Sequence, residues 1–71
     1  MKKATSYARI MTDAIADTSY EIQKVLEDIK GQEKPTEEQM IFIWEAYADI
    51  QEFMKKLDKE LTTLDRKVDE D

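Results

Sequence analysis

Apolar residues recur along the chain at alternating steps of three and four, the spacing that places side chains on one stripe of an α-helix. One stripe lies in the first half of the chain and a second lies in the second half. The pattern therefore predicts two long amphipathic helices, over residues about 5–30 and 37–68. The first stripe consists of Ala4, Ala8, Met11, Ile15, Thr18, Ile22, Val25 and Ile29. The second consists of Met40, Ile43, Tyr47, Ile50, Met54, Leu57, Leu61, Leu64 and Val68.

A short turn segment separates the two stripes. Pro35 is disfavoured inside a helix, and Thr36 followed three residues later by Gln39 matches the capping box that begins a helix. Gly31 is placed to end the first helix in the left-handed conformation. Because the connection is short, we expect the two helices to lie side by side and antiparallel.

The first helix contains a second capping-box pattern, Thr18 to Glu21, which offers a break near Asp17. The heptad phase nevertheless continues from Ile15 to Ile22, so we expect one continuous helix. The acidic residues 69–71 stand at the negative end of the second helix dipole, where we expect fraying. The sequence thus predicts a single helical-hairpin domain over residues 1–71.

The second stripe is flanked by apolar side chains that a lone hairpin would leave in water. These are Ile41, Phe42, Trp44 and Phe53. Leaving a large apolar side chain exposed forgoes roughly 1.5–3 kcal/mol relative to burial. A chain of 71 residues also builds only a marginal core of its own. We therefore expect an all-α fold in which two hairpins pair into a four-helix bundle, as a homodimer.

The composition argues against catalysis. The chain has no cysteine and no histidine, so it can form neither a disulfide nor a zinc site of the Cys/His type. Its serines and threonines have no imidazole that could activate them as nucleophiles. Its carboxylates fall outside both stripes, whereas di-metal sites in helix bundles require inward-facing carboxylates. We expect no enzymatic activity, no cofactor and no metal.

The net charge of −6 is concentrated in the second half of the chain. Residues 1–30 carry five basic and five acidic side chains, whereas residues 31–71 carry six basic and twelve acidic ones. An acidic balance disfavours general binding of nucleic-acid phosphates. No apolar run approaches the length that spans a bilayer, so we expect a cytoplasmic protein without a membrane partner.

The first half of the second helix combines aromatic and aliphatic anchors with negative charge, as protein-binding surfaces do. We expect this surface to bind another protein, unless its apolar members are buried in the dimer. In general type, such a chain resembles small regulators or inhibitors encoded by bacteria and phages. The candidate partner-binding residues are Ile41, Phe42, Trp44, Phe53, Glu38, Glu45, Asp49 and Glu52.

Two alternatives remain open at this point. A helical hairpin dimer of this size could bind RNA through a basic stripe in the second half of the second helix, although interleaved acidic residues dilute that stripe. The basic residues concerned are Lys55, Lys56, Lys59 and Arg66. The chain could also be a purely structural assembly module, in which no surface residue has a specific partner.

Overall fold

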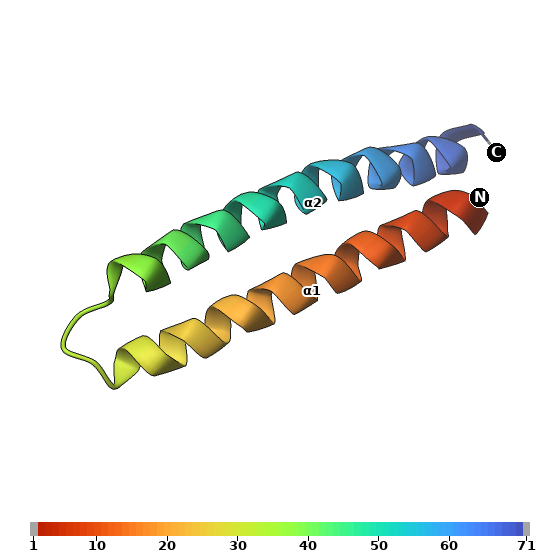
Figure 1. Cartoon of the computed structure of the whole chain (residues 1–71). Helices are drawn as coiled ribbons and strands as arrows, with labels where there is room; N and C mark the ends of the chain where they lie inside the picture. The colour runs from red at the N-terminus through yellow and green to blue at the C-terminus, as the bar shows by residue number, and fades with distance from the viewer. Residues whose placement is uncertain (1, 71) are drawn as a thin grey trace.

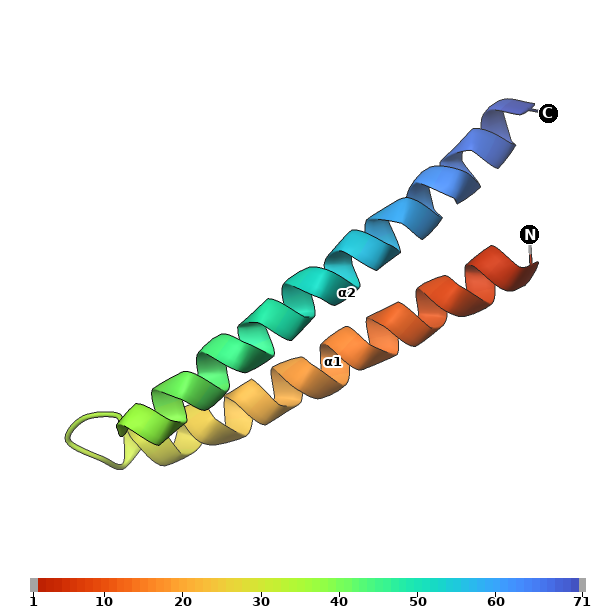
Figure 2. The same ribbon diagram turned by 45° about the horizontal axis from the view of Figure 1, so that its top comes forward.

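The computed structural model is a hairpin of two helices joined by one turn (Figure 1). It describes the backbone of residues 2–70 and the side chains of residues 5–67. Helix α1 spans Lys2–Lys30 and helix α2 spans Glu37–Glu70. The two run antiparallel, so the start of α1 and the end of α2 lie at the same end of a rod of 57 × 15 × 14 Å (Figures 1 and 2). The predicted all-helical antiparallel hairpin is confirmed.

Both helices extend further than the sequence pattern predicts. Helix α1 begins at Lys2 rather than near residue 5, and it continues through Asp17 without a break. Helix α2 includes Asp69 and Glu70, which were expected to fray. Residue 71, the last of the predicted acidic tail, lies outside the described residues.

A reciprocal pair of hydrogen bonds begins α2. The backbone N–H of Gln39 donates to Thr36 Oγ1 at 3.1 Å, and the backbone N–H of Thr36 donates to Gln39 Oε1 at 2.9 Å. This confirms the predicted capping box, which satisfies two N–H groups that the helix start would otherwise leave unpaired. The side-chain amide of Gln39 also donates to Gln32 Oε1 at 2.7 Å, which fastens the turn to the start of α2.

The end of α1 closes differently from the prediction. Gly31 has no positive φ, so the expected left-handed cap is wrong. Instead, the N–H of Gly31 donates to the Asp28 carbonyl at 3.2 Å, and the N–H of Gln32 donates to the Ile29 carbonyl at 2.9 Å. Each of these bonds spans three residues instead of the four of an α-helix, and each uses a carbonyl that the last helical turn would otherwise leave without a partner. Lys30 places a cation at the negative end of the helix dipole.

The stripe predicted for α1 faces α2. Met11 is buried, with 8% of its surface exposed. The other described members of the stripe are half-buried, while the side chain of Ala4 lies outside the described residues. The 3.6-residue period was therefore sufficient to identify the inner surface of α1. The half-buried members are Ala8, Ile15, Thr18, Ile22, Val25 and Ile29.

The stripe predicted for α2 is correct at five of its eight described positions, which are half-buried, and wrong at the other three. Tyr47, Met54 and Leu61 are exposed by 47%, 56% and 51%, although the pattern placed them in the hairpin core. Their places beside α1 are taken by Ala46, which is 7% exposed, and by the half-buried Phe53 and Glu60. The apolar stripe of α2 is wider than the surface that one neighbouring helix covers, so the pattern alone could not choose between its two sides. The side chain of Val68 lies outside the described residues.

The resulting core is thin. Among the described side chains, Met11 and Ala46 are the only apolar ones that are buried, and no large one is fully enclosed. Ten large apolar side chains of the same residues are exposed. Two helices pressed together along one line thus leave most of the apolar surface of each helix in contact with water.

Candidate functional site

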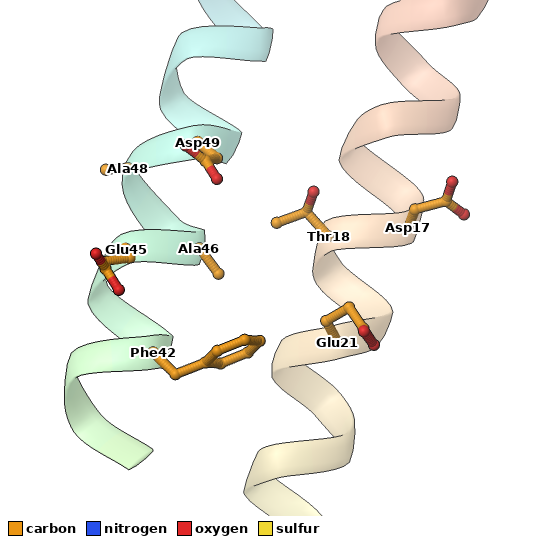
Figure 3. A pocket seen from close by; sticks show the side chains of 8 residues that line it. All are labelled: Asp17, Thr18, Glu21, Phe42, Glu45, Ala46, Ala48 and Asp49. Carbon is orange, nitrogen blue, oxygen red and sulfur yellow. The ribbon is translucent and has the colours of Figure 1, made fainter. Parts of the chain in front are cut away.

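One side of the hairpin carries an open groove of about 660 Å³ between α1 and α2. The ring of Phe42 points from α2 toward α1 across this groove, and 43% of its surface is exposed (Figure 3). The acidic side chains around it come from both helices. We call this side the acidic face. Its lining consists of Asp17, Thr18 and Glu21 from α1 and Phe42, Glu45, Ala46, Ala48 and Asp49 from α2.

Four carboxylates give the groove its negative charge, and one of them is paired. Lys24 Nζ lies 2.8 Å from Glu21 Oε2, one turn along α1. The hydrogen bond to that carboxylate raises the pKa of Lys24, and the same ammonium lies 5.1 Å from the centre of the Tyr20 ring. The remaining negative charge therefore comes mainly from Asp17, Glu45 and Asp49.

Among the described side chains, the opposite side of the hairpin has no charged residue along its middle. In a helix, residues at i+3 and i+4 lie on opposite sides of residue i. Thr18 and Ala46 line the groove, and they stand three positions after Ile15 and Ile43. The residues four positions after Ile15 and Ile43 therefore lie on the side of the hairpin opposite the groove. We call this side the uncharged face. Its flanking residues are Thr12, Ser19 and Leu26 on α1 and Tyr47, Met54 and Leu61 on α2, all of them exposed.

An aromatic pair lies on this second side. The rings of Trp44 and Tyr47 meet edge-on, with centroids 5.8 Å apart and an interplanar angle of 84°. Trp44 is 62% exposed, the highest value among the exposed large apolar side chains of the described residues. A large aromatic surface is therefore held in a defined geometry without being covered.

The structure divides the predicted partner-binding residues among several surfaces. Phe42, Glu45 and Asp49 come together in the groove. Phe53 is half-buried between the helices, and Trp44 belongs to the edge of the uncharged face. The other predicted residues, Ile41, Glu38 and Glu52, are exposed on α2 but do not line the groove.

Sequence reasoning missed the contribution of α1 to the groove. Asp17, Thr18 and Glu21 line it from the opposite helix. Their proximity to Phe42 depends on which residues of α1 and α2 stand side by side in the hairpin, and no motif in the sequence indicates that alignment. Thr18 was the only polar member of the first stripe, and that irregularity was the one available signal.

The basic residues considered for nucleic-acid binding are exposed on α2, in the half that leads away from the turn. None of them lines the acidic groove. They share the surface with exposed Asp58 and Asp65. The residues are Lys55, Lys56, Lys59 and Arg66.

Among the described residues, no three potential ligands stand close enough together to hold a metal ion. Neither helix, within the same residues, contains a stretch long and apolar enough to cross a bilayer. No protein-family model, curated protein or solved structure matches the chain.

Proposed function

We propose that the protein is a non-catalytic regulator or inhibitor that acts by binding another protein. In this proposal two hairpins pair through their uncharged faces into a four-helix bundle. The acidic face of each copy then remains open to the partner. The observation that carries the proposal is the contrast between the two sides: one is a charged groove around Phe42, and the other is uncharged along its middle and exposes Tyr47, Met54 and Leu61.

The thin core supports dimerisation. Tyr47, Met54 and Leu61 are each about half exposed in the single hairpin. Covering the exposed half of such a side chain contributes about 1 kcal/mol. The three together, on two copies, would contribute about 6 kcal/mol, which is comparable with the whole stability of a small domain, roughly 5–15 kcal/mol.

Electrostatics favour the uncharged face as the site of the second copy. A second acidic face placed on the first would bring Asp17, Glu45 and Asp49 of the two copies together. Like charges brought together in a dehydrated interface cost several kcal/mol. The groove is therefore suited to a partner of different composition.

The groove is suited to a basic segment of another protein. Its lining combines an aromatic ring with carboxylates from both helices, so a partner with one apolar side chain between lysine or arginine residues would match both features. The apolar contact would supply affinity, while the charges would accelerate encounter and select among partners.

The test is affinity capture with matched surface variants. Tagged wild-type protein is compared with a Glu45→Lys/Asp49→Lys variant and with a Lys55→Glu/Lys59→Glu control, and protein and nucleic acid are both measured in the eluate. The proposal predicts a protein partner that the groove variant loses and the control keeps. Circular dichroism and sedimentation of both variants should match the wild type.

The same experiment addresses the nucleic-acid alternative. Nucleic acid in the eluate, lost with the Lys55→Glu/Lys59→Glu variant and kept with the groove variant, would replace the present proposal by RNA binding. Capture of the same proteins by all three forms would contradict a specific role for the groove.

A further inference from the structure

Two hairpins can join their uncharged faces around a two-fold axis in two ways. If the axis runs parallel to the helices, both turns lie at the same end and α1 of one copy packs on α2 of the other. If the axis runs across the helices, the turns lie at opposite ends, and α1 packs on α1 while α2 packs on α2. All neighbouring helices are antiparallel in both arrangements, so helix direction does not distinguish them.

The edges of the uncharged face distinguish the two arrangements. Each edge is formed by the residues that follow the inner row by one position, because one step rotates about 100° around the helix. On α1 these residues follow Ala8, Ile15, Ile22 and Ile29. On α2 they follow Ile43, Ile50 and Leu57, and Glu37 precedes Trp44 by the same spacing of seven residues. The α1 edge is Arg9, Ala16, Gln23 and Lys30, and the α2 edge is Glu37, Trp44, Gln51 and Asp58.

The α1 edge is therefore basic or neutral, and the α2 edge is acidic or neutral. The hairpin register sets which edge residues stand at the same level along the rod. Lys30 ends α1 and Glu37 begins α2, so these two share a level. In the groove, Thr18 on α1 lies at a level between Ala46 and Asp49 on α2 (Figure 3), so nine residues further from the turn Arg9 reaches the level of Asp58.

In the arrangement with both turns at one end, each α1 edge residue meets the partner residue at its own level. Arg9 then lies beside the partner's Asp58, and Lys30 lies beside the partner's Glu37. The two-fold axis makes each of these pairs twice. Exposed pairs of this kind are individually weak, but four of them act in the same direction.

Side-chain sizes agree with the charges. Between these ion pairs, Gln23 would lie beside the partner's Trp44, and Ala16 beside the partner's Gln51. Along the middle of the face, Ser19 lies at the level of Tyr47 and Thr12 at the level of Met54. A large side chain thus meets a small one at the levels of Ala16, Ser19 and Thr12, which allows these layers to interdigitate.

The arrangement with the turns at opposite ends loses the complementarity of both charge and side-chain size. It sets the basic α1 edge against a second basic edge, and the acidic α2 edge against a second acidic edge. It also packs Tyr47 and Met54 of one copy against Tyr47 and Met54 of the other, so that large side chains meet large ones. Like charges across an interface select against that arrangement.

We propose that the second copy docks on the uncharged face with its turn at the same end, so that α1 packs on the partner's α2. This inference rests on the dimer of the proposed function and specifies its geometry. A face of 57 by 15 Å covers about 850 Å², which is close to the area per partner of a stable protein–protein interface, roughly 800 Å².

Cysteine cross-linking tests the geometry directly, because the natural chain has no cysteine. Ala16 and Gln51 stand on the two edges, near the middle of the rod, and both are exposed. The variants Ala16→Cys and Gln51→Cys are purified separately, and each is treated alone or after mixed refolding with a short thiol cross-linker. We expect a cross-linked dimer from the mixture and little from either variant alone. Self-linking of each variant alone, without a mixed product, would overturn the proposed geometry.

Charge reversal provides a second readout on the same dimer. Arg9→Asp and Asp58→Arg should each weaken dimerisation about tenfold, because two attractions become two repulsions. The double variant Arg9→Asp/Asp58→Arg should recover the wild-type dissociation constant. Unchanged dimerisation in both single variants would contradict the geometry but leave the dimer intact, whereas a wild-type protein that is monomeric by sedimentation would overturn the dimer itself.

Discussion

The indole of Trp44 and the ring of Tyr47 pack edge-on, 5.8 Å between centroids, while 62% and 47% of the two side chains remain exposed. Edge-on aromatic contacts are favoured beyond simple area burial by about 0.5–1.5 kcal/mol. The pair is therefore ordered within a single helix before anything covers it. Such preorganisation reduces the entropy lost on association.

Tryptophan fluorescence should report the covering of this pair. Trp44 is the only tryptophan, so its emission has no other source. We expect blue-shifted, poorly quenched emission at high protein concentration, because the indole lies against the partner's α1. Dilution through the dissociation constant should shift the emission to the red and increase quenching by iodide. Emission typical of water-exposed indole at every concentration would contradict this placement of Trp44.

A charge in the middle of the uncharged face should dissociate the dimer. We expect Met54→Glu to be monomeric at micromolar concentration, since an unpaired charge in a dry interface costs about 3 kcal/mol or more in each copy. Thr63→Glu is the matched control, because Thr63 is also exposed on α2 and, nine residues from Met54, lies on the opposite side of the helix. The control should remain dimeric in size-exclusion chromatography with light scattering. A dimeric Met54→Glu variant would show that the copies meet elsewhere.

Gly31 provides a test of the turn. Because its φ is not positive and the nearest atom to an added Cβ, the Asp28 carbonyl oxygen, is 3.7 Å away, alanine fits without strain. We expect Gly31→Ala to stabilise the protein by about 0.4–1 kcal/mol by restricting the unfolded chain. Chemical denaturation followed by circular dichroism measures the change. A loss of stability would indicate the left-handed cap that the sequence suggests.

The capping box at the start of α2 should contribute measurably to stability. Thr36→Ala removes the acceptor for the Gln39 N–H, so we expect a loss of about 1 kcal/mol. For a domain of this size that loss corresponds to a decrease of roughly 4–8 °C in Tm. Thr36→Ser keeps the hydroxyl and should remain near the wild type. Equal melting temperatures for all three forms would show that the cap does not limit stability.

The sequence was sufficient for the fold because each element carries a local signal. The capping box of Thr36 and Gln39 marks the start of α2, and the spacing from Met11 to Ile29 identifies the inner side of α1. Both signals come from residues three or four positions apart in the sequence. They therefore do not depend on how the two helices pack.

The candidate site was less predictable because it depends on packing. The pattern on α2 contained two overlapping stripes, one through Phe53 and one through Met54, and only the contact with α1 selects between them. Likewise, Asp17 and Asp49 are far apart in sequence and meet at the groove only through the register of the hairpin. Sequence periodicity reports how much apolar surface a helix has, not which neighbour covers each part.

Sedimentation equilibrium of the wild-type chain at micromolar concentration tests the central claim most directly. The proposed bundle predicts a mass of twice the 8.4 kDa chain, and the Met54→Glu variant should sediment as one chain under the same conditions. A wild-type mass of 8.4 kDa, with the helices intact, would contradict the dimer, because the uncharged face would then remain in water without a second copy.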